Sequence, residues 1–294
     1  MKKIIEVAGA PRPHWVGDGF PVHGMFGYNG DGVADRSPFL MLDYAPSYRF
    51  EPNTGYRRGV GAHPHRGFET VTIVFEGEVE HRDNTGAGGI IGKGDVQWMT
   101  AGAGIIHEEY HSPAFSQSGG QFSVAQLWVN LPSHAKSTPA GYQGLTRNDI
   151  PQVALDSNAG SVRVIAGEFN GTKGPAATHS PMNVLDVKLS AGQTVDFAQP
   201  EGWTTLVVMM TGVAELNGDK ILRNAEVATL TTQGTSVTLK ANADSHFLIL
   251  SGEPIDEPVV GYGPFVMNSQ AEIIQAVHDF NAGKFGPQPG TAAG

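Results

Sequence analysis

Two short clusters of histidine and glutamate have the residue types and the spacing of a metal site. The first contains His63 and His65, and the second contains His107 and Glu109. In an extended strand, successive side chains point to opposite faces, so each pair would present both of its members on one face. If the two strands face each other inside a barrel, three imidazoles and one carboxylate converge on a single point. That ligand set suits a divalent transition metal such as iron.

The flanking sequence predicts strands around both clusters. After the first cluster, Thr70–Phe75 is a β-branched and aromatic run that ends at Glu76-Gly77, where we expect a turn. Before the second cluster, Gly92–Asp95 predicts a turn and Val96–Met99 predicts a short strand. Two histidines two residues apart on a helix would diverge by roughly 200°. The predicted metal site therefore depends on the strand assignment.

The composition limits the class of protein. The chain has 294 residues, enough for two ordinary domains, and its 39 glycines and 19 prolines suit a β protein rich in turns. The formal net charge is -10 and no run of lysine or arginine stands out. This argues against direct binding to nucleic acid or to an anionic membrane surface.

The chain contains no cysteine, which excludes disulfides, thiolate nucleophiles and cysteine-based zinc sites. Histidines and carboxylates must therefore carry any chemistry. Near the N-terminus, Glu6 and Pro11–His14 interrupt any apolar segment of a signal peptide, so we expect a cytoplasmic protein. No apolar stretch approaches the ~20 residues needed to span a bilayer. We expect a monomer.

The two halves of the chain repeat one pattern. Gly67–Thr70 and Gly77–Glu80 recur in the same order as Gly202–Thr205 and Gly212–Glu215, which predicts two copies of one β unit. Carrying this alignment through the second copy places four other residues at the positions of His63, His65, His107 and Glu109: Ala198, Pro200, Thr238 and Lys240. The second copy is therefore expected to lack the ligands and to have a structural role.

One helix is predicted, near the C-terminus. Ser269–Glu272 fits a capping box, and Gly283 can end the helix. An apolar stripe should pack the helix against a sheet, and it contains Ile273, Ile274, Val277 and Phe280.

Several long segments together resemble the pirin family. They are Gly61–Val71, Gly94–Gly102 with the following Gly104, His107 and Glu109, then Gln126–Pro132, and Gly263–Asn268 near the end. The resemblance covers nearly the whole chain, and the segments of the first half are long enough to be specific.

The resemblance implies an all-β fold of two tandem cupin domains, which are jelly-roll β-barrels, with a short C-terminal helix. Residues 1–146 would form the metal-binding domain and residues 147–294 a domain without metal ligands. Three histidines and one glutamate bind the metal in pirins, and they correspond here to His63, His65, His107 and Glu109. The general cupin pattern would also offer Glu69, which we place beside the ligands instead of among them.

The resemblance implies two classes of function. Several pirins open flavonols such as quercetin with O2, while others are regulators that act through a protein partner, either a transcriptional co-regulator or a modulator of pyruvate metabolism. We expect a metal-dependent dioxygenase with Fe2+ as the first choice, and Mn, Co, Ni, Cu or Zn as alternatives. The alternative is a non-catalytic, iron-binding regulatory protein. A third class is a storage-type cupin without metal.

A catalytic role follows from the ligand count. Four protein ligands on an octahedral ion leave two positions open. Glu109 would accept the hydroxyl proton of the flavonol, and ring opening would release carbon monoxide. Substrate would supply the electrons, and no nicotinamide or flavin fingerprint is present.

The other chemically competent residues have ordinary explanations. His14, His23, His179, His246 and His278 are isolated and are expected to be hydrogen-bonded surface or core residues. His81 and His111 are expected in a hairpin or at a rim, and Glu108 should point away from the metal. Five large side chains could line a pocket for a flat aromatic ligand, although such residues in a barrel are more frequently core: Phe68, Trp98, Met99, Phe122 and Trp128.

Overall fold

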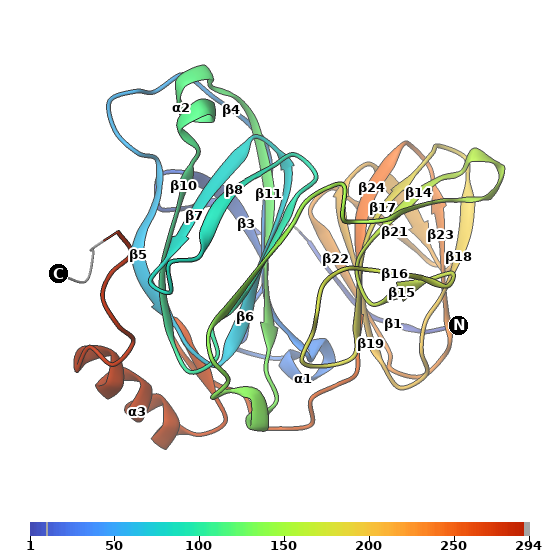
Figure 1. The fold of residues 1–294 in the computed structure, drawn as a ribbon. Helices are drawn as coiled ribbons and strands as arrows, with labels where there is room; N and C mark the ends of the chain where they lie inside the picture. Colours follow the sequence, from blue (N-terminus) through green and yellow to red (C-terminus); the bar gives the residue numbers. More distant parts are fainter. Residues whose placement is uncertain (10, 291–294) are drawn as a thin grey trace. The chain divides into compact units, whose positions relative to one another are not determined.

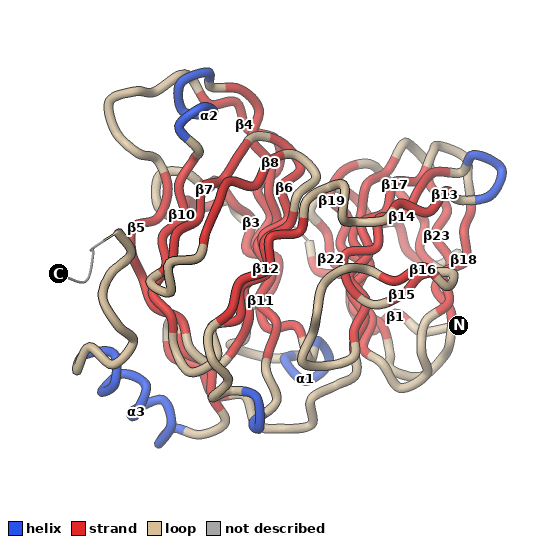
Figure 2. The backbone as a smooth tube through the Cα atoms, in the orientation of Figure 1, coloured by secondary structure: helices blue, strands red, loops and turns tan. Residues whose placement is uncertain are grey.

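The computed structural model describes residues 1–9 and 11–290, and strands make up most of it (Figures 1 and 2). Contacts divide the chain into two compact units. We call them the first unit, which contains Pro13–Asn29, Phe39–Arg147 and Asp256–Gly294, and the second unit, which contains Met1–Arg12, Gly30–Pro38 and Asn148–Ile255. Each unit thus takes a terminal segment from the opposite half of the sequence. The predicted boundary between the two repeats, which lies between residues 146 and 147, stays a prediction.

The first unit consists of two antiparallel sheets with the strand orders β12-β9-β6-β11-β4-β3-β2 and β5-β10-β7-β8, and a small sheet β25-β26. The strands are β2 His14–Val16, β3 Phe20–Phe26, β4 Phe39–Phe50, β5 Gly59–His65, β6 Phe68–Glu76, β7 Glu78–Asp83, β8 Gly88–Gly92, β9 Val96–Thr100, β10 Ile105–His111, β11 Gly120–Asn130, β12 Gly141–Leu145, β25 Val260–Tyr262 and β26 Phe265–Met267. The helices are α2 Pro113–Ser118, the 3-10 turn Ser133–Ala135 and α3 Gln270–Asn281.

The second unit repeats this plan with the strand orders β1-β22-β19-β24-β17-β14-β13 and β18-β23-β20-β21, and a small sheet β15-β16. The strands are β1 Ile4–Ala8, β13 Gln152–Ala154, β14 Gly160–Ala166, β15 Glu168–Phe169, β16 Thr172–Lys173, β17 Met182–Leu189, β18 Thr194–Ala198, β19 Thr204–Thr211, β20 Val213–Leu216, β21 Lys220–Arg223, β22 Glu226–Leu230, β23 Ser236–Ala241 and β24 Ser245–Gly252. It also has α1 Val33–Arg36 and the 3-10 turn Asp156–Asn158. The predicted all-β fold with two copies of one unit is confirmed.

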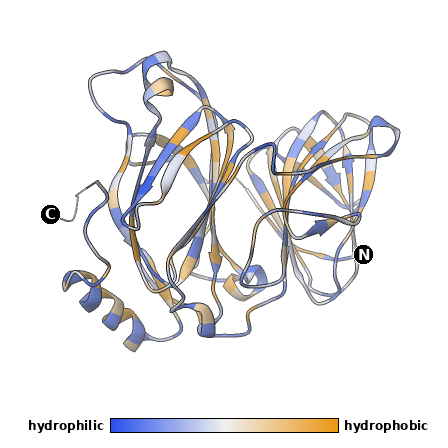
Figure 3. Cartoon of the chain, in the orientation of Figure 1, coloured by the Kyte–Doolittle hydropathy of each residue, from blue (hydrophilic) through white to orange (hydrophobic). Residues whose placement is uncertain are grey.

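Side-chain burial alternates along many of these strands, as expected when one face of a sheet packs on a core. In β23, for example, Val237, Leu239 and Ala241 are buried while the residues between them are more exposed. Figure 3 shows hydrophobic residues recurring along the strands of each unit, whereas α3 is largely hydrophilic on its visible side. None of the helices in the described part of the chain is both long and apolar enough to span a membrane.

The alignment of the second copy onto the proposed ligands is wrong in register. Ala198 and Lys240 are exposed and Thr238 is partly exposed, and Pro200 lies beyond the end of β18. The residues that point inward are their neighbours, because Phe197 pairs with Val237 and both belong to the apolar core of this unit. A slip of one residue along a strand turns every side chain to the other face. The corrected register still places apolar groups where the first unit has histidines.

The C-terminal helix α3 forms as predicted. Ser269 is its N-cap and accepts a hydrogen bond from the Glu272 backbone N–H, and Gly283 follows the helix with a φ of 72°. Ile273 is buried, but Ile274 is 63% exposed and does not belong to the apolar stripe. The buried face of the helix packs in a cluster that includes Phe265 of β26.

The segment before α3 is tied to the turn that follows the first histidine pair. Lys136 is 2% exposed, and its ammonium group donates to the Gly67 carbonyl at 2.8 Å, to Asn130 Oδ1 at 2.8 Å and to the Val266 carbonyl at 2.9 Å. Burial lowers the pKa of Lys136 to about 8. Gly67 has a φ of 90°, and a Cβ atom there would lie 2.0 Å from the Val266 carbonyl oxygen, so only glycine fits.

We predict that Lys136→Met lowers the free energy of unfolding by about 3 kcal/mol, because it leaves three buried oxygen acceptors without a donor. The measurement is chemical denaturation at neutral pH. Lys93→Met is the matched control, since Lys93 lies exposed in a turn and its replacement should change stability by less than about 0.5 kcal/mol. Equal stability of the two variants would contradict the bracing role of Lys136.

Candidate metal centre

The two predicted clusters lie on neighbouring strands of one sheet and do not face each other across a barrel. β5 pairs with β10 so that His63 is opposite His107 and His65 is opposite Ile105. Residues directly opposite each other in an antiparallel pair point to the same face. Both histidines of β5 therefore share a face with His107.

A third strand extends this face. β7 pairs with the other edge of β10, where Glu109 is opposite His81 and His107 is opposite Asp83. The pairing of β10 with β5 shifts between His107, opposite His63, and Glu109, opposite Val60. This irregularity is a β-bulge: β5 has one extra residue opposite β10, while the pairing of β10 with β7 stays regular.

The side chains form two overlapping groups of possible ligands. The ligand atoms of His63, His65 and His107 lie within 4.8 Å of one another, and so do those of His81, His107 and Glu109. The ring centroids of His63 and His107 are 4.3 Å apart, and each lies 4.8 Å from that of His65. The structure thus brings the three predicted histidines together. Glu109 belongs to the second group, which shares His107 with the first.

Burial keeps the inner imidazoles neutral. His65 is 4% exposed and His107 is fully buried, while His63 is partly exposed. Desolvation, together with the neighbouring histidines, lowers the pKa of His65 and of His107 well below the ordinary value. A neutral imidazole keeps a lone pair, which is the form that binds a metal ion.

Each of the three histidines uses one ring nitrogen for a protein contact. His63 Nδ1 lies 2.8 Å from the Gly61 carbonyl oxygen, His65 bonds to the backbone of Pro264, and His107 Nδ1 lies 3.3 Å from His81 Nδ1. Among the described residues, the buried His65 Nδ1 and His107 Nε2 have no hydrogen-bond partner. Metal-binding histidines are held in this way, with the second nitrogen bonded to the protein. The donor set fits a divalent transition metal.

An aromatic wall stands beside His65. The Trp128 ring stacks on Phe68 with centroids 4.2 Å apart and on Tyr28 at 6.0 Å, and both Trp128 and Phe68 lie 5.2 Å from the His65 ring. The aromatic candidate on β9, Trp98, points away from the histidines. It pairs with Val71 of β6, whereas the adjacent Thr72 contacts Glu109 from the opposite face of that sheet.

Phe122 belongs to a separate apolar cluster with Phe50 and Phe115, and Met99 packs with Ala101 and Ile105. His111 also lies with these aromatic rings, and its Nε2 donates to the Gly19 carbonyl at 2.9 Å. Phe122 and Met99 are core, as the more frequent case for such side chains predicts. His111 was expected in a hairpin or at a rim, but it is buried among these rings.

Sequence reasoning missed His81 as a neighbour of the centre. His81 is fully buried, its Nε2 lies 3.3 Å from Asp83 Oδ2, and Gln97 Nε2 lies 2.9 Å from its Nδ1. The Tyr142 ring stacks on it at 5.2 Å. The hairpin that was predicted is present, but His81 points inward. The alternation of Val79, His81 and Asp83 with charged residues was the signal that could have found it.

The prediction that Glu69 lies beside the ligands is wrong. Glu69 pairs with Thr100 and Val129, so it lies on the face of β6 opposite that of Phe68, whose ring contacts His65. It is fully buried and accepts a hydrogen bond from Thr100 Oγ1 at 2.7 Å. Burial raises its pKa to about 7.

The remaining polar candidates behave as expected. Glu108 points away from the centre and forms an ion pair with Arg57 at 3.3 Å. His246 Nε2 lies 2.5 Å from Asp186 Oδ1 in the second unit, as expected for a hydrogen-bonded surface or core histidine.

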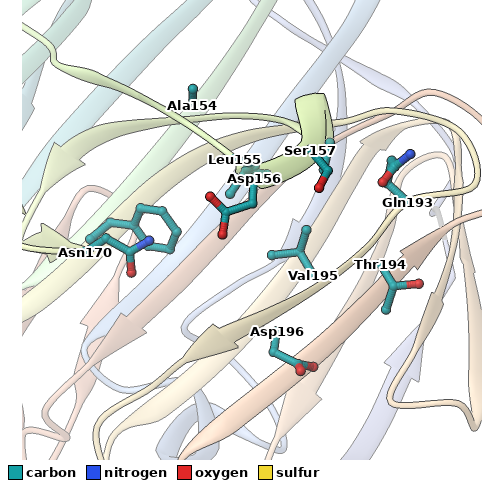
Figure 4. A pocket seen from close by; sticks show the side chains of 11 residues that line it. Ala154, Leu155, Asp156, Ser157, Asn170, Gln193, Thr194, Val195 and Asp196 are labelled. Carbon is teal, nitrogen blue, oxygen red and sulfur yellow. The ribbon is translucent and has the colours of Figure 1, made fainter.

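The second unit contains a cavity of about 320 Å3 (Figure 4). Its lining includes the exposed carboxylates of Asp156 and Asp196, and its apolar part is formed by residues such as Leu155 and Phe169 that belong to the core. Asp196 accepts a hydrogen bond from Thr238 at 2.5 Å. The lining contains no histidine, so this cavity is no counterpart of the cluster in the first unit.

Comparisons with known proteins agree with the resemblance. The Pirin family model matches residues 19–129, and the Pirin C-terminal cupin domain matches residues 184–286. A Pseudomonas aeruginosa protein named "Putative quercetin 2,3-dioxygenase" is 55% identical over 97% of this chain and 99% of its own length. Pirin-1 of Arabidopsis thaliana is 42% identical over 85% of this chain and 83% of its own. A crystal structure of quercetin 2,3-dioxygenase from Acinetobacter baumannii is 53% identical, with a TM-score of 0.95 over 97% of this chain and 99% of that chain.

The raised pKa of Glu69 predicts a pH dependence of stability. Below about pH 4.5 the carboxyl is protonated in both the folded and the unfolded state, and between about pH 4.5 and 7 only the folded state keeps the proton. The free energy of unfolding should therefore fall as pH rises through this window. Glu69→Gln should remove the fall and gain up to about 3 kcal/mol over the parent at pH 8.

Urea denaturation at several pH values measures this difference. The matched control is Glu168→Gln on the exposed position of β15, which should leave the pH profile of the parent unchanged. A Glu69→Gln variant with the same pH profile as the parent would show that Glu69 ionises normally.

Proposed function

Because the chain belongs to the pirin family, we propose that it is a metal-dependent dioxygenase that opens flavonols such as quercetin with O2. The names of two close relatives support this activity, since each relative covers nearly the whole chain. The structural observation that carries the proposal is the group of His63, His65 and His107, whose rings lie within 4.8 Å on one face of a sheet.

In this proposal, His63, His65, His107 and Glu109 hold the metal, and Fe2+ is the first choice, with Mn, Co, Ni, Cu and Zn as alternatives. A bound divalent metal would supply Lewis acidity and open coordination positions for the flavonol and O2. The unpartnered ring nitrogens of His65 and His107 support the assignment of these residues as ligands. The assignment of Glu109 as a ligand is supported by its position on β10, two residues after His107 and therefore on the same face of the sheet.

The chain's own residues would bind the flavonol and remove its proton. Glu109 is 7% exposed, and as a carboxylate it can accept the proton of the flavonol hydroxyl. Thr72 Oγ1 lies 3.3 Å from Glu109 Oε1 and 2.8 Å from Gln126 Oε1, so its one proton is shared between two acceptors and would help to hold the carboxylate in place. The partly exposed His63 marks the side from which a substrate would enter, and the Trp128 and Phe68 rings offer a flat surface for an aromatic ligand.

The alternative is a non-catalytic, iron-binding regulatory protein that acts through a protein partner. It would use the same four residues, with water at the open positions, and would present a surface that changes with metal occupancy. Turnover of a flavonol distinguishes the two functions. A cytoplasmic location and a monomeric state stay predictions of the sequence.

We predict that the Fe2+-loaded protein consumes O2 and bleaches quercetin, and that His63→Ala and Glu109→Ala each reduce the rate at least 100-fold. The physical reason is that each variant removes a ligand, and Glu109→Ala also removes the proton acceptor. The measurement combines an oxygen electrode with the absorbance of the flavonol.

His278→Ala is the matched control, because His278 lies on α3, is 70% exposed and should leave turnover unchanged. Free Fe2+ at the same concentration gives the background rate. Turnover by the loaded protein no faster than this background would overturn the dioxygenase proposal and favour the regulatory alternative.

A further inference from the structure

A chain of buried polar groups ends on His107. His107 Nδ1 lies 3.3 Å from His81 Nδ1, and His81 Nε2 lies 3.3 Å from Asp83 Oδ2. Gln97 Nε2 also approaches His81 Nδ1, at 2.9 Å. His81, Gln97 and His107 are fully buried, and Asp83 is 4% exposed. Water therefore does not compete for these contacts, and their directions are set by the protein.

For a neutral His81, the donors and acceptors in this chain have one consistent assignment. A carboxylate only accepts hydrogen bonds, so the contact with Asp83 requires a proton on His81 Nε2. A neutral His81 then has its lone pair on Nδ1, where the Gln97 amide group can donate. His107 Nδ1 faces the same atom at 3.3 Å, and a proton on His107 Nδ1 avoids the repulsion that two facing lone pairs would cause. The lone pair of His107 is left on Nε2, the atom without a protein partner.

Asp83 is fixed by several hydrogen bonds, which allows it to determine which nitrogen of His81 carries the proton. Its Oδ1 accepts hydrogen bonds from the Thr85 backbone N–H at 2.8 Å, from Thr85 Oγ1 at 2.6 Å and from the Ala87 backbone N–H at 3.2 Å. Oδ1 thus orders the turn after β7, while Oδ2 faces His81. The Tyr142 ring covers one face of His81, with an angle of 26° between the ring planes. Neither Asp83 nor His81 is free to rotate.

We propose that Asp83 and His81 are positioning residues that fix His107 in the tautomer with its proton on Nδ1, and so prepare His107 Nε2 to bind a divalent transition metal. This inference rests on the proposed function of His107 as a ligand. The second nitrogen of a metal-binding histidine commonly donates to a carboxylate or a carbonyl group. Here an intervening imidazole carries the effect of the carboxylate to the ligand.

Asp83→Asn tests the proposal because it reverses the tautomers with almost no change of shape. Three donors hold the oxygen at the Oδ1 position, so the new amide nitrogen takes the Oδ2 position and donates to His81 Nε2. The proton of His81 then moves to Nδ1, where the Gln97 amide must turn its oxygen to accept it and His107 Nδ1 must present a lone pair. His107 is driven to carry its proton on Nε2, where it blocks the metal. Replacing the orienting aspartate of a catalytic triad by asparagine acts through the same change of tautomer.

The experiment has two readouts. Long-range 1H–15N NMR spectra of the metal-free protein, labelled on histidine, should show His107 protonated on Nδ1 in the parent and on Nε2 in Asp83→Asn. Competition with a chromophoric chelator should show Ni2+ binding weakened about 10–100-fold in the variant. Thr85→Val is the matched control: it removes the hydroxyl at Asp83 Oδ1, leaves Oδ2 untouched, and should keep both the tautomer and the affinity of the parent.

The outcomes separate this inference from the proposed function. A parent protein that does not bind Ni2+ overturns the proposed function of the site. A parent that binds Ni2+, with a variant of equal affinity, overturns only the role of Asp83 and His81. If Asp83→Asn does not fold, the parent spectrum decides: a proton on His107 Nε2 in the metal-free parent overturns the proposal, and a proton on Nδ1 supports it.

Discussion

The antiparallel register of β5 and β10 is the constraint on which the histidine face depends. With His63 opposite His107, two residues of β5 and one of β10 point to the same side of the sheet. A shift of one residue in this pairing would turn one strand's histidines outward. The bulge absorbs the extra residue of β5 beside Glu108, so the pairing of β10 with β7 stays regular and Glu109 keeps the face of His107.

Burying the imidazoles of His65 and His107 has a free-energy cost that the surroundings must offset. Desolvation and mutual repulsion keep His65 and His107 neutral, and each of these rings has one nitrogen bonded and one left over. An unpartnered buried polar atom is destabilising in the absence of a ligand. A metal ion bound at these two nitrogens, as proposed, would not have to displace a protein hydrogen bond first.

The sequence predicted the parts of the site that depend on local pattern. Alternation places His63 and His65 on one face, and a capping box at Ser269 predicts the start of α3. It could not predict what depends on register or on distant contacts. The alignment of Ala198 with His63 failed because matching glycine turns does not fix which face a strand presents, and Phe197 proved to be the inward residue.

Long-range contacts explain the other differences. Glu69 was placed beside the ligands because the general cupin pattern offers it. The turn at Gly67 separates β5 from β6, however, and the pairing of Glu69 with Thr100 sets its face. The contact of His65 with Pro264 joins residues about 200 positions apart, which no local pattern reveals. His81 was within reach of strand periodicity, because Val79 marks the buried face of β7.

The return of the last segment to the first unit has a consequence for biosynthesis. Pro264 and Val266 support the strand of His65 and the turn at Gly67, yet they are translated after the whole second unit. The strand of His65 and the turn at Gly67 therefore lack these contacts while only the first half of the chain has been synthesised.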